Sequence, residues 1–457
     1  MALQFSMDFG RPCDLGKNVY SNRCIYAKRS LVGNVLQLKK VLVISYYWPP
    51  SGGPGVQRVL KFCKYLPEFG WEPIVLTVKD GEYPNLDYSL EKEADKLGIR
   101  VIKTKTYEPF KFYKWMTGKN SMPSYELNKS KSGLFSKLSK WIRMNYFIPD
   151  ARKGWIPYGV KAGRELLKNE KIDMIFSSGP PHSLHFIAKK LKEEFSVPWV
   201  SDFRDPWTDL FYYDGHERSA IAEKKDAEME KEILESADGV TTVSDGTKNI
   251  LTNKGNDINI NVVHNGYDED DFCHTAESKI KNSKKIITYV GSMALSQVSE
   301  EFFKGISDLI WDNNEDIEIR FIGDVHEKAW ELIKSYNLRD KVFHLGYIPH
   351  NEVISKLFES DILLLVIPNT KESKLIITGK LYEYLRSGIP ILALADLDGD
   401  AAKILNDTKS GIVVSHDDAE GIKDIILQKE YELSQNIEQF SRKELTHLLT
   451  EIFNRVQ

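Results

Sequence analysis

The most constraining stretch of this sequence is a strand, a glycine-rich turn and a helix in immediate succession. It runs from Lys39 to Lys64 and reads KKVLVISYYWPPSGGPGVQRVLKFCK. Its apolar, β-branched run from Val41 to Ser45 predicts a strand buried on both faces. Prolines and glycines then interrupt regular structure, and apolar residues at helical spacing follow. This order gathers backbone N–H groups and a helix N-terminus at one place, which suits a phosphate or a carboxylate.

The glycine-rich turn does not identify a ligand by itself. Gly52, Gly53 and Gly55 would equally serve a chain that merely has to turn. Their spacing differs from the dinucleotide-binding fingerprint, and no Gly-Lys-Ser/Thr triplet follows as in a P-loop. A second, independent feature is needed.

The rest of the chain alternates short apolar strands with helices in two series, separated by the lysine-rich segment Lys279–Lys285. Such alternation predicts parallel sheets with right-handed crossovers. We therefore expect an α/β protein with two Rossmann-like domains facing each other across a cleft. The expected boundaries are a disordered extension at 1–38, a first domain at 39–278, a second at 279–430, and carboxyl-terminal helices at 431–457 that pack back on the first domain.

Composition narrows the class of protein. The chain has 457 residues, 42% hydrophobic and 28% charged, with a net charge of −4. This balance gives no reason to expect nucleic acid as a partner. Four sparse cysteines without metal-ligand spacing favour a reducing, cytoplasmic location and no structural metal. No apolar run approaches the ~20 residues that span a bilayer.

A basic, aromatic insertion interrupts the first domain at 107–155. From Lys103 to Lys153 there are twelve basic and three acidic side chains, a net charge of +9. Leu134, Trp141 and their apolar neighbours share one helical face beside lysines. This pattern is typical of a helix lying on an anionic membrane surface, although a helix that packs on its own domain would look similar.

The predicted strands of the first domain end in polar loops. In an open parallel sheet, ligands lie beyond the carboxyl ends of the strands, so these loops should converge. These loops carry His182, which follows two prolines, and Asp202, Arg204 and Asp205. As alternatives to a contact with a ligand, His182 could be a structural turn histidine, and Asp205 could simply pair with Arg204.

Several motifs resemble those of family-four (group 1) retaining glycosyltransferases of the GT-B fold, of the kind that build bacterial surface polysaccharides. The opening segment KVLVISYYWPPSGGPGVQR is one of them. In the second half YVGS, IRFIGD, VFHLGYIPHNEVISKLFESDILLLV and GKLYEYLRSGIPILAL follow in order. The resemblance covers roughly Lys39 to Val456. It implies a nucleotide-sugar bound mainly by the second domain and an acceptor bound mainly by the first.

The resemblance also implies roles for individual residues. Glu383 matches the glutamate that binds the ribose hydroxyls of the nucleotide. The expected donor site further comprises Gly53, Gly55, Gly291, Ser292, Lys380 and Leu381. In the first domain, His182 is a catalytic candidate that would contact sugar or acceptor, Asp205 is a candidate catalytic carboxylate, and Asp202 and Arg204 are candidates for binding the acceptor.

Two departures from the family pattern affect the expected chemistry. Leu375 stands where the family has its first motif glutamate, and Glu372 is a catalytic candidate if the loop is remodelled. The family's Arg/Lys pair, which neutralises the diphosphate, is missing from GSMALSQVSEE. Lys380, Lys374 or Arg204 would then have to replace it.

The resulting expectation is a glycosyltransferase that needs no cofactor or metal. It would transfer a sugar from a nucleotide-sugar to a glycan or lipid-linked glycan, in the cytoplasm or on the inner membrane face. Because pyrophosphate-linked groups leave readily once their charge is stabilised, electrostatic positioning should dominate catalysis. The alternatives are a catalytically idle GT-B scaffold and, less favoured, a nucleotide-sugar epimerase.

Overall fold

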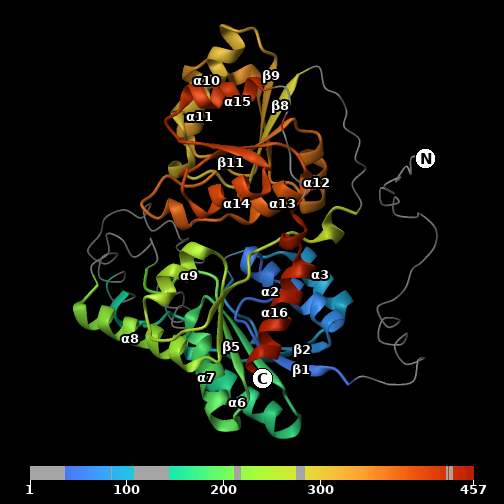
Figure 1. Cartoon of the computed structure of the whole chain (residues 1–457), viewed down its shortest axis with the longest axis vertical. Coiled ribbons are helices and arrows are strands. Elements are labelled where there is room, and N and C mark those ends of the chain that lie inside the picture. Colours follow the sequence, from blue (N-terminus) through green and yellow to red (C-terminus); the bar gives the residue numbers. More distant parts are fainter. Residues whose placement is uncertain are drawn as a thin grey trace, which may run out of the picture.

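The computed structural model describes residues 37–83, 85–107, 141, 144–209, 218–273, 284–428, 431 and 436–457. The expected extension at 1–38 lies almost wholly outside these residues, as does most of the basic insertion. The described chain forms two stacked α/β domains (Figure 1). Each is built on its own parallel sheet.

The first sheet has seven parallel strands in the order β3-β2-β1-β4-β5-β6-β7. Leu42 and Ile44 of β1 belong to one hydrophobic cluster, and Val41 and Val43 to another. The predicted burial of this strand on both faces is therefore confirmed. The strands are β1 (Lys39–Ile44), β2 (Trp71–Val78), β3 (Arg100–Thr104), β4 (Met174–Gly179), β5 (Trp199–Phe203), β6 (Gly239–Thr242) and β7 (Ile260–Val262).

The second sheet has six parallel strands in the order β10-β9-β8-β11-β12-β13. The sequence did not predict β13, a partly buried edge strand whose four residues, GIVV, carry little periodicity. The strands are β8 (Lys285–Val290), β9 (Ile317–Ile322), β10 (Val342–Gly346), β11 (Ile362–Val366), β12 (Ile391–Leu394) and β13 (Gly411–Val414).

Helices cover both sheets. Those of the first domain are α2 (Pro54–Tyr65), α3 (Tyr88–Leu97), α6 (Ile156–Asn169), α7 (His185–Phe195), α8 (Ala220–Ser236) and α9 (Asp245–Thr252). Those of the second domain are α10 (Glu300–Trp311), α11 (Glu327–Ser335), α12 (His350–Phe358), α13 (Gly379–Ser387), α14 (Asp400–Thr408) and α15 (Ala419–Leu427).

The final helix, α16 (Arg442–Val456), returns to the first domain. It lies beside α2 in the lower half of Figure 1. Its apolar residues Leu445, Leu449 and Phe453 join the cluster that covers β1. The hydroxyl of Ser441 accepts a hydrogen bond from the N–H of Glu444 at 3.2 Å and caps the helix start. The chain therefore crosses from the second domain back to the first before α16 begins.

Candidate active site

A cleft of about 610 Å³ lies between the domains, lined by loops at the carboxyl ends of the strands. The first domain supplies residues 52–57 and 204–205, and the second supplies 377–380 and Glu383. Arg442 comes from α16. The direction in which successive strands are added changes between β1 and β4 in the first sheet and between β8 and β11 in the second. These are the points at which open α/β sheets hold ligands.

Two helices begin at the cleft and face each other. A Cβ on Gly379, the first residue of α13, would lie 3.8 Å from the side chain of Pro54, the first residue of α2. Neither helix start has a side-chain cap, and the residue before Pro54, Gly53, has a φ of 111° that favours glycine. Uncapped N–H groups and two converging helix dipoles make this part of the cleft attractive to an anion.

Arg204 is held beneath the first of these helix starts. Its Nε donates to the carbonyl of Gly179 at 2.9 Å, and its Nη2 donates to the carbonyl of Pro180. Its buried Nη1 has no hydrogen-bond partner among the described residues. A Cβ on Gly55 would come within 2.3 Å of Nη1, so only glycine leaves room for this guanidinium. Arg204 thus offers an unused donor to the cleft.

Lys380 approaches the cleft from α13. Its Nζ donates to the hydroxyl of Tyr289 at 3.1 Å and lies 4.3 Å from the centre of that ring. Burial lowers the pKa of Lys380 to about 8, which the charge of Glu383 partly opposes. A Cβ on Gly291 would meet Cε of Lys380 at 2.5 Å. Gly291 therefore makes room for the lysine and does not itself line the cleft.

Arg442 is the cation that sequence reasoning missed. Its side chain is 4% exposed, it lines the cleft, and its Nη1 has no partner among the described residues. Burial, together with the nearby Arg58, lowers the pKa of Arg442 to about 10. No local motif marks this residue. The expectation that the last helices pack back on the first domain was the only available signal.

Asp205 lies on the cleft wall beside Arg204. Desolvation raises the pKa of its carboxyl, although Arg204 opposes the change. Asp205 is an exposed residue whose carboxylate reaches the cleft.

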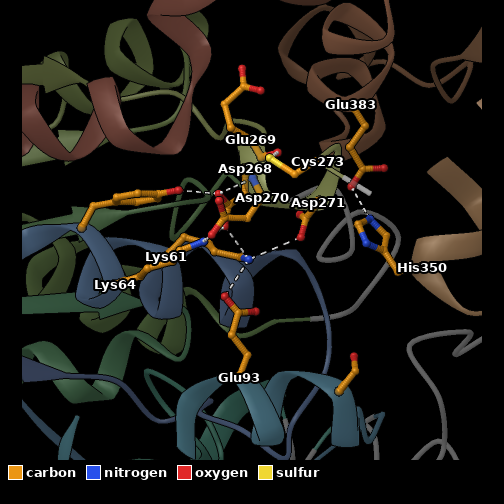
Figure 2. A network of polar contacts seen from close by, with 12 residues as sticks. Lys61, Lys64, Glu93, Asp268, Glu269, Asp270, Asp271, Cys273, His350 and Glu383 are labelled. Atoms are coloured by element: carbon orange, nitrogen blue, oxygen red, sulfur yellow. Dashed lines mark hydrogen bonds and ion pairs between the residues drawn. The ribbon is translucent and has the colours of Figure 1, made fainter. Parts of the chain in front are cut away.

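Glu383 also reaches the cleft, and Figure 2 shows its carboxylate beside His350 of α12. The distance from Nε2 of His350 to Oε1 of Glu383 is 3.0 Å. Burial lowers the pKa of His350, but the hydrogen bond and charge of Glu383, with help from Asp271, raise it to about 9. His350 is therefore a cation at neutral pH.

Asp202, predicted to bind the acceptor, lies beneath the cleft instead of lining it. Its carboxylate is fully buried and accepts hydrogen bonds from Arg58, from Ser178 at 2.7 Å and from Thr241 at 2.8 Å. Burial acts to raise the pKa of this carboxyl, but the charge and hydrogen bond of Arg58, with the hydrogen bonds of Ser178 and Thr241, hold it below its usual value. This carboxylate organises the floor of the site and has no free face for a sugar.

His182, predicted to be catalytic, is also buried outside the cleft wall. Its ring stacks on Trp207, with centroids 4.8 Å apart and planes 8° apart. Burial lowers the pKa of His182 well below its usual value, so it stays neutral. Neither ring nitrogen has a hydrogen-bond partner among the described residues. The structure therefore places His182 outside the cleft lining, packed between aromatic rings and not held by a hydrogen bond of the turn.

Three further predicted residues do not line the cleft. Leu381 is 0% exposed in the core of the second domain. Glu372 precedes the 3₁₀ helix η9 (Ser373–Leu375), outside the cleft lining. The carbonyl of Ser292 accepts the hydroxyl of Tyr289 at 3.0 Å, so Ser292 supports the partner of Lys380. Leu375 packs against α9 of the first domain, since a Cβ on Gly246 would meet it at 2.5 Å.

Two family models match adjacent parts of the chain. Residues 130–271 match the model described as Glycosyltransferase Family 4, and residues 273–444 match Glycosyl transferases group 1. The chain belongs to the family-four, group 1 glycosyltransferases. Among curated proteins, none matches this glycosyltransferase in sequence.

Solved structures with the same two-domain GT-B fold cover nearly the whole glycosyltransferase. Sucrose-phosphate synthase from Thermosynechococcus elongatus is 14% identical with a TM-score of 0.61, covering 92% of this chain and 99% of its own. HepE from Anabaena, in complex with UDP and glucose, is 12% identical with a TM-score of 0.58, and the match covers 91% of this chain and 100% of HepE. TarM is 14% identical with a TM-score of 0.59, and the match covers 91% of this chain and 99% of TarM. Among the described residues, no helix is long and apolar enough to cross a membrane.

Proposed function

We propose that this glycosyltransferase transfers a sugar, with retention of configuration, from a nucleotide-sugar to a glycan or lipid-linked glycan in polysaccharide synthesis. The observation that carries the proposal is the convergence of Arg204, Lys380 and Arg442 with two uncapped helix starts beside Glu383. A nucleoside diphosphate leaving group carries at least two negative charges, and its departure depends on preorganised positive groups. These three cations would replace the family's Arg/Lys pair and serve without a divalent metal.

In the proposed reaction the carboxylate of Glu383 accepts the ribose hydroxyls. The bond from the anomeric carbon to the diphosphate oxygen breaks, and the acceptor hydroxyl attacks on the face that the diphosphate leaves. The departing phosphate oxygen takes the hydroxyl proton. Asp205, on the acceptor side of the cleft, orients that hydroxyl. Attack on the vacated face retains the anomeric configuration without a protein nucleophile.

The first test is thermal stability of the protein with UDP-, GDP-, ADP- and dTDP-sugars, for wild type and Glu383→Ala. UDP-sugars lead the panel because HepE binds UDP and glucose in its solved structure. A donor at 100 times its dissociation constant should stabilise the folded state by about 2.7 kcal/mol. We expect one nucleotide class to stabilise wild type and not the variant. No stabilisation by any donor would favour the idle scaffold.

A second test separates catalysis from binding. The wild type should slowly hydrolyse its donor without acceptor, the sugar should be released with its configuration retained, and EDTA should leave the rate unchanged. A donor that binds without turnover would favour a scaffold. Inversion of configuration or loss of activity in EDTA would overturn the mechanism.

We further propose that the basic insertion places the enzyme on the anionic, cytoplasmic membrane surface where a lipid-linked acceptor resides. Tyr107, Trp141 and Tyr146 at the described ends of this segment are exposed aromatic side chains, which suit a membrane interface. Residues 108–140 and 142–143, which hold all of the predicted amphipathic helix except Trp141, lie outside the described residues. Failure to bind vesicles containing anionic lipid at low salt would contradict this proposal.

A further inference from the structure

His350 of α12 and Glu383 of α13 form an ion pair beside the cleft. Glu383 lines the cleft and its side chain is 21% exposed, so a ligand in the cleft can reach its carboxylate. The His350 side chain is 39% exposed and lies outside the cleft lining. Oε1 of Glu383 is engaged by His350 at 3.0 Å. Among the described residues, Oε2 has no hydrogen-bond partner. One carboxylate oxygen is thus held by the protein and the other is left for a ligand.

Charged groups from three elements surround the His350 imidazole. Glu383 faces it from α13, Asp271 from the 3₁₀ helix η6 (Glu269–Asp271), and Lys61 from α2. Lys61 is itself paired with Glu93 at 2.8 Å, Asp268 at 2.6 Å and Asp271 at 3.6 Å (Figure 2). Its positive charge is therefore already compensated. The carboxylates consequently dominate the field at His350 and keep the imidazole protonated.

A lone glutamate would be poorly suited to the role proposed for Glu383. Its long side chain has several rotamers, and ordering it on binding costs conformational entropy. Its negative charge also opposes a diphosphate in the same cleft. A cation fixed on one carboxylate oxygen removes both difficulties.

We propose that His350 is a positioning residue for the donor. It fixes one oxygen of Glu383 and offsets the carboxylate charge, so that the other oxygen binds the ribose beside an anionic diphosphate. This inference rests on the proposed function, in which Glu383 binds the ribose. It assigns nucleotide affinity to a residue that does not itself need to touch the nucleotide.

The experiment measures dissociation constants of UDP, GDP, ADP and dTDP by calorimetry for wild type, His350→Gln, His350→Lys and His447→Gln. At pH 7 we expect His350→Gln to weaken binding about three- to tenfold. His350→Lys should restore most of the affinity because it returns a cation. His447, an exposed histidine stacked on Phe69, is the matched control and should leave the affinity unchanged.

A pH series distinguishes positioning from general damage to the fold. The informative quantity is the dissociation constant of His350→Gln divided by that of wild type. Lys380 loses its proton in both proteins, so its effect on the dissociation constant cancels in this ratio. The ratio should fall towards one as pH rises through about 9, where wild-type His350 loses its proton. In Glu383→Gln, NMR of the imidazole should show the pKa of His350 reduced towards its usual value.

The outcomes separate the two proposals. If no nucleoside diphosphate binds the wild type, the proposed function fails and this inference fails with it. If one binds, but His350→Gln matches wild type at every pH, the positioning role is wrong while the proposed function stands. A loss of affinity that is equal at all pH values, and that His350→Lys does not restore, would also overturn the inference.

Discussion

Arg58 and Asp202 form a fully buried ion pair under the floor of the cleft. Nε of Arg58 lies 3.1 Å from Oδ2 of Asp202, and Nη2 lies 2.8 Å from Oδ1. The remaining nitrogen, Nη1, donates to the carbonyl of His264 at 2.7 Å. The pair therefore connects α2, which begins at the glycine-rich turn, to β5 and to the segment that leads into the second domain.

Removing one partner of this pair should strongly destabilise the first domain. Asp202→Ala leaves the Arg58 guanidinium buried without its counter-charge, so we expect the free energy of unfolding to fall by about 3–5 kcal/mol. Denaturant unfolding measures the change. The control is Glu194→Ala, which removes the exposed partner of Arg164 and should cost less than about 1 kcal/mol. Equal effects of the two substitutions would contradict the structural role of Asp202.

The titration of Lys380 should make donor binding depend on pH. The protonated amine binds an anion better, so the dissociation constant of a nucleoside diphosphate should rise above the pKa of about 8. The rise is limited to about tenfold per pH unit. Lys380→Arg should bind equally well from pH 6.5 to 8.5, because a guanidinium keeps its proton there. A wild-type profile as flat as that of Lys380→Arg, measured by calorimetry, would contradict a role for this amine.

Arg442 should contribute to anion binding without supporting the fold. Arg442→Met removes a buried cation with an unused donor, and we expect affinity for inorganic pyrophosphate to fall about ten- to hundredfold. The melting temperature should not decrease, because burying this charge is itself costly. Arg455→Met, at an exposed position of the same helix, is the control and should leave affinity unchanged. Unchanged affinity in Arg442→Met would remove this residue from the site.

Gly55 should be required for space and not for flexibility. The methyl group of Gly55→Ala would lie 2.3 Å from Nη1 of Arg204 and displace the guanidinium. Pyrophosphate affinity should therefore fall, and the free energy of unfolding should fall with it, because the displaced guanidinium gives up its hydrogen bonds to the carbonyls of Gly179 and Pro180. Gly305→Ala in α10, where the nearest atom is a flexible lysine carbon at 3.3 Å, should bind as wild type does. Wild-type affinity in Gly55→Ala would show that Arg204 is not held as described.

The sequence by itself determined the architecture and one part of the cleft. Strand burial and helix periodicity are local properties, because each apolar run has to be covered wherever it lies. Two series of strands and helices therefore predicted two parallel sheets, as observed. The glycine-rich turn, Lys380 and Glu383 were recognised from contiguous motifs, and all three line the cleft. Arg204 and Asp205 were found because they directly follow a buried strand.

Only the tertiary structure decided which polar side chains face the cleft and which lie below it. Asp202 and Arg204 are two residues apart at the end of β5, yet one is sealed against Arg58 and the other lines the cleft. Arg442 enters the site only because α16 crosses back to the first domain, and His350 reaches Glu383 only through the packing of α12 on α13. Such contacts join segments far apart in the sequence. No periodicity or motif in the sequence predicts these contacts. How deeply a side chain is buried, and which way it points, depend on the residues packed around it.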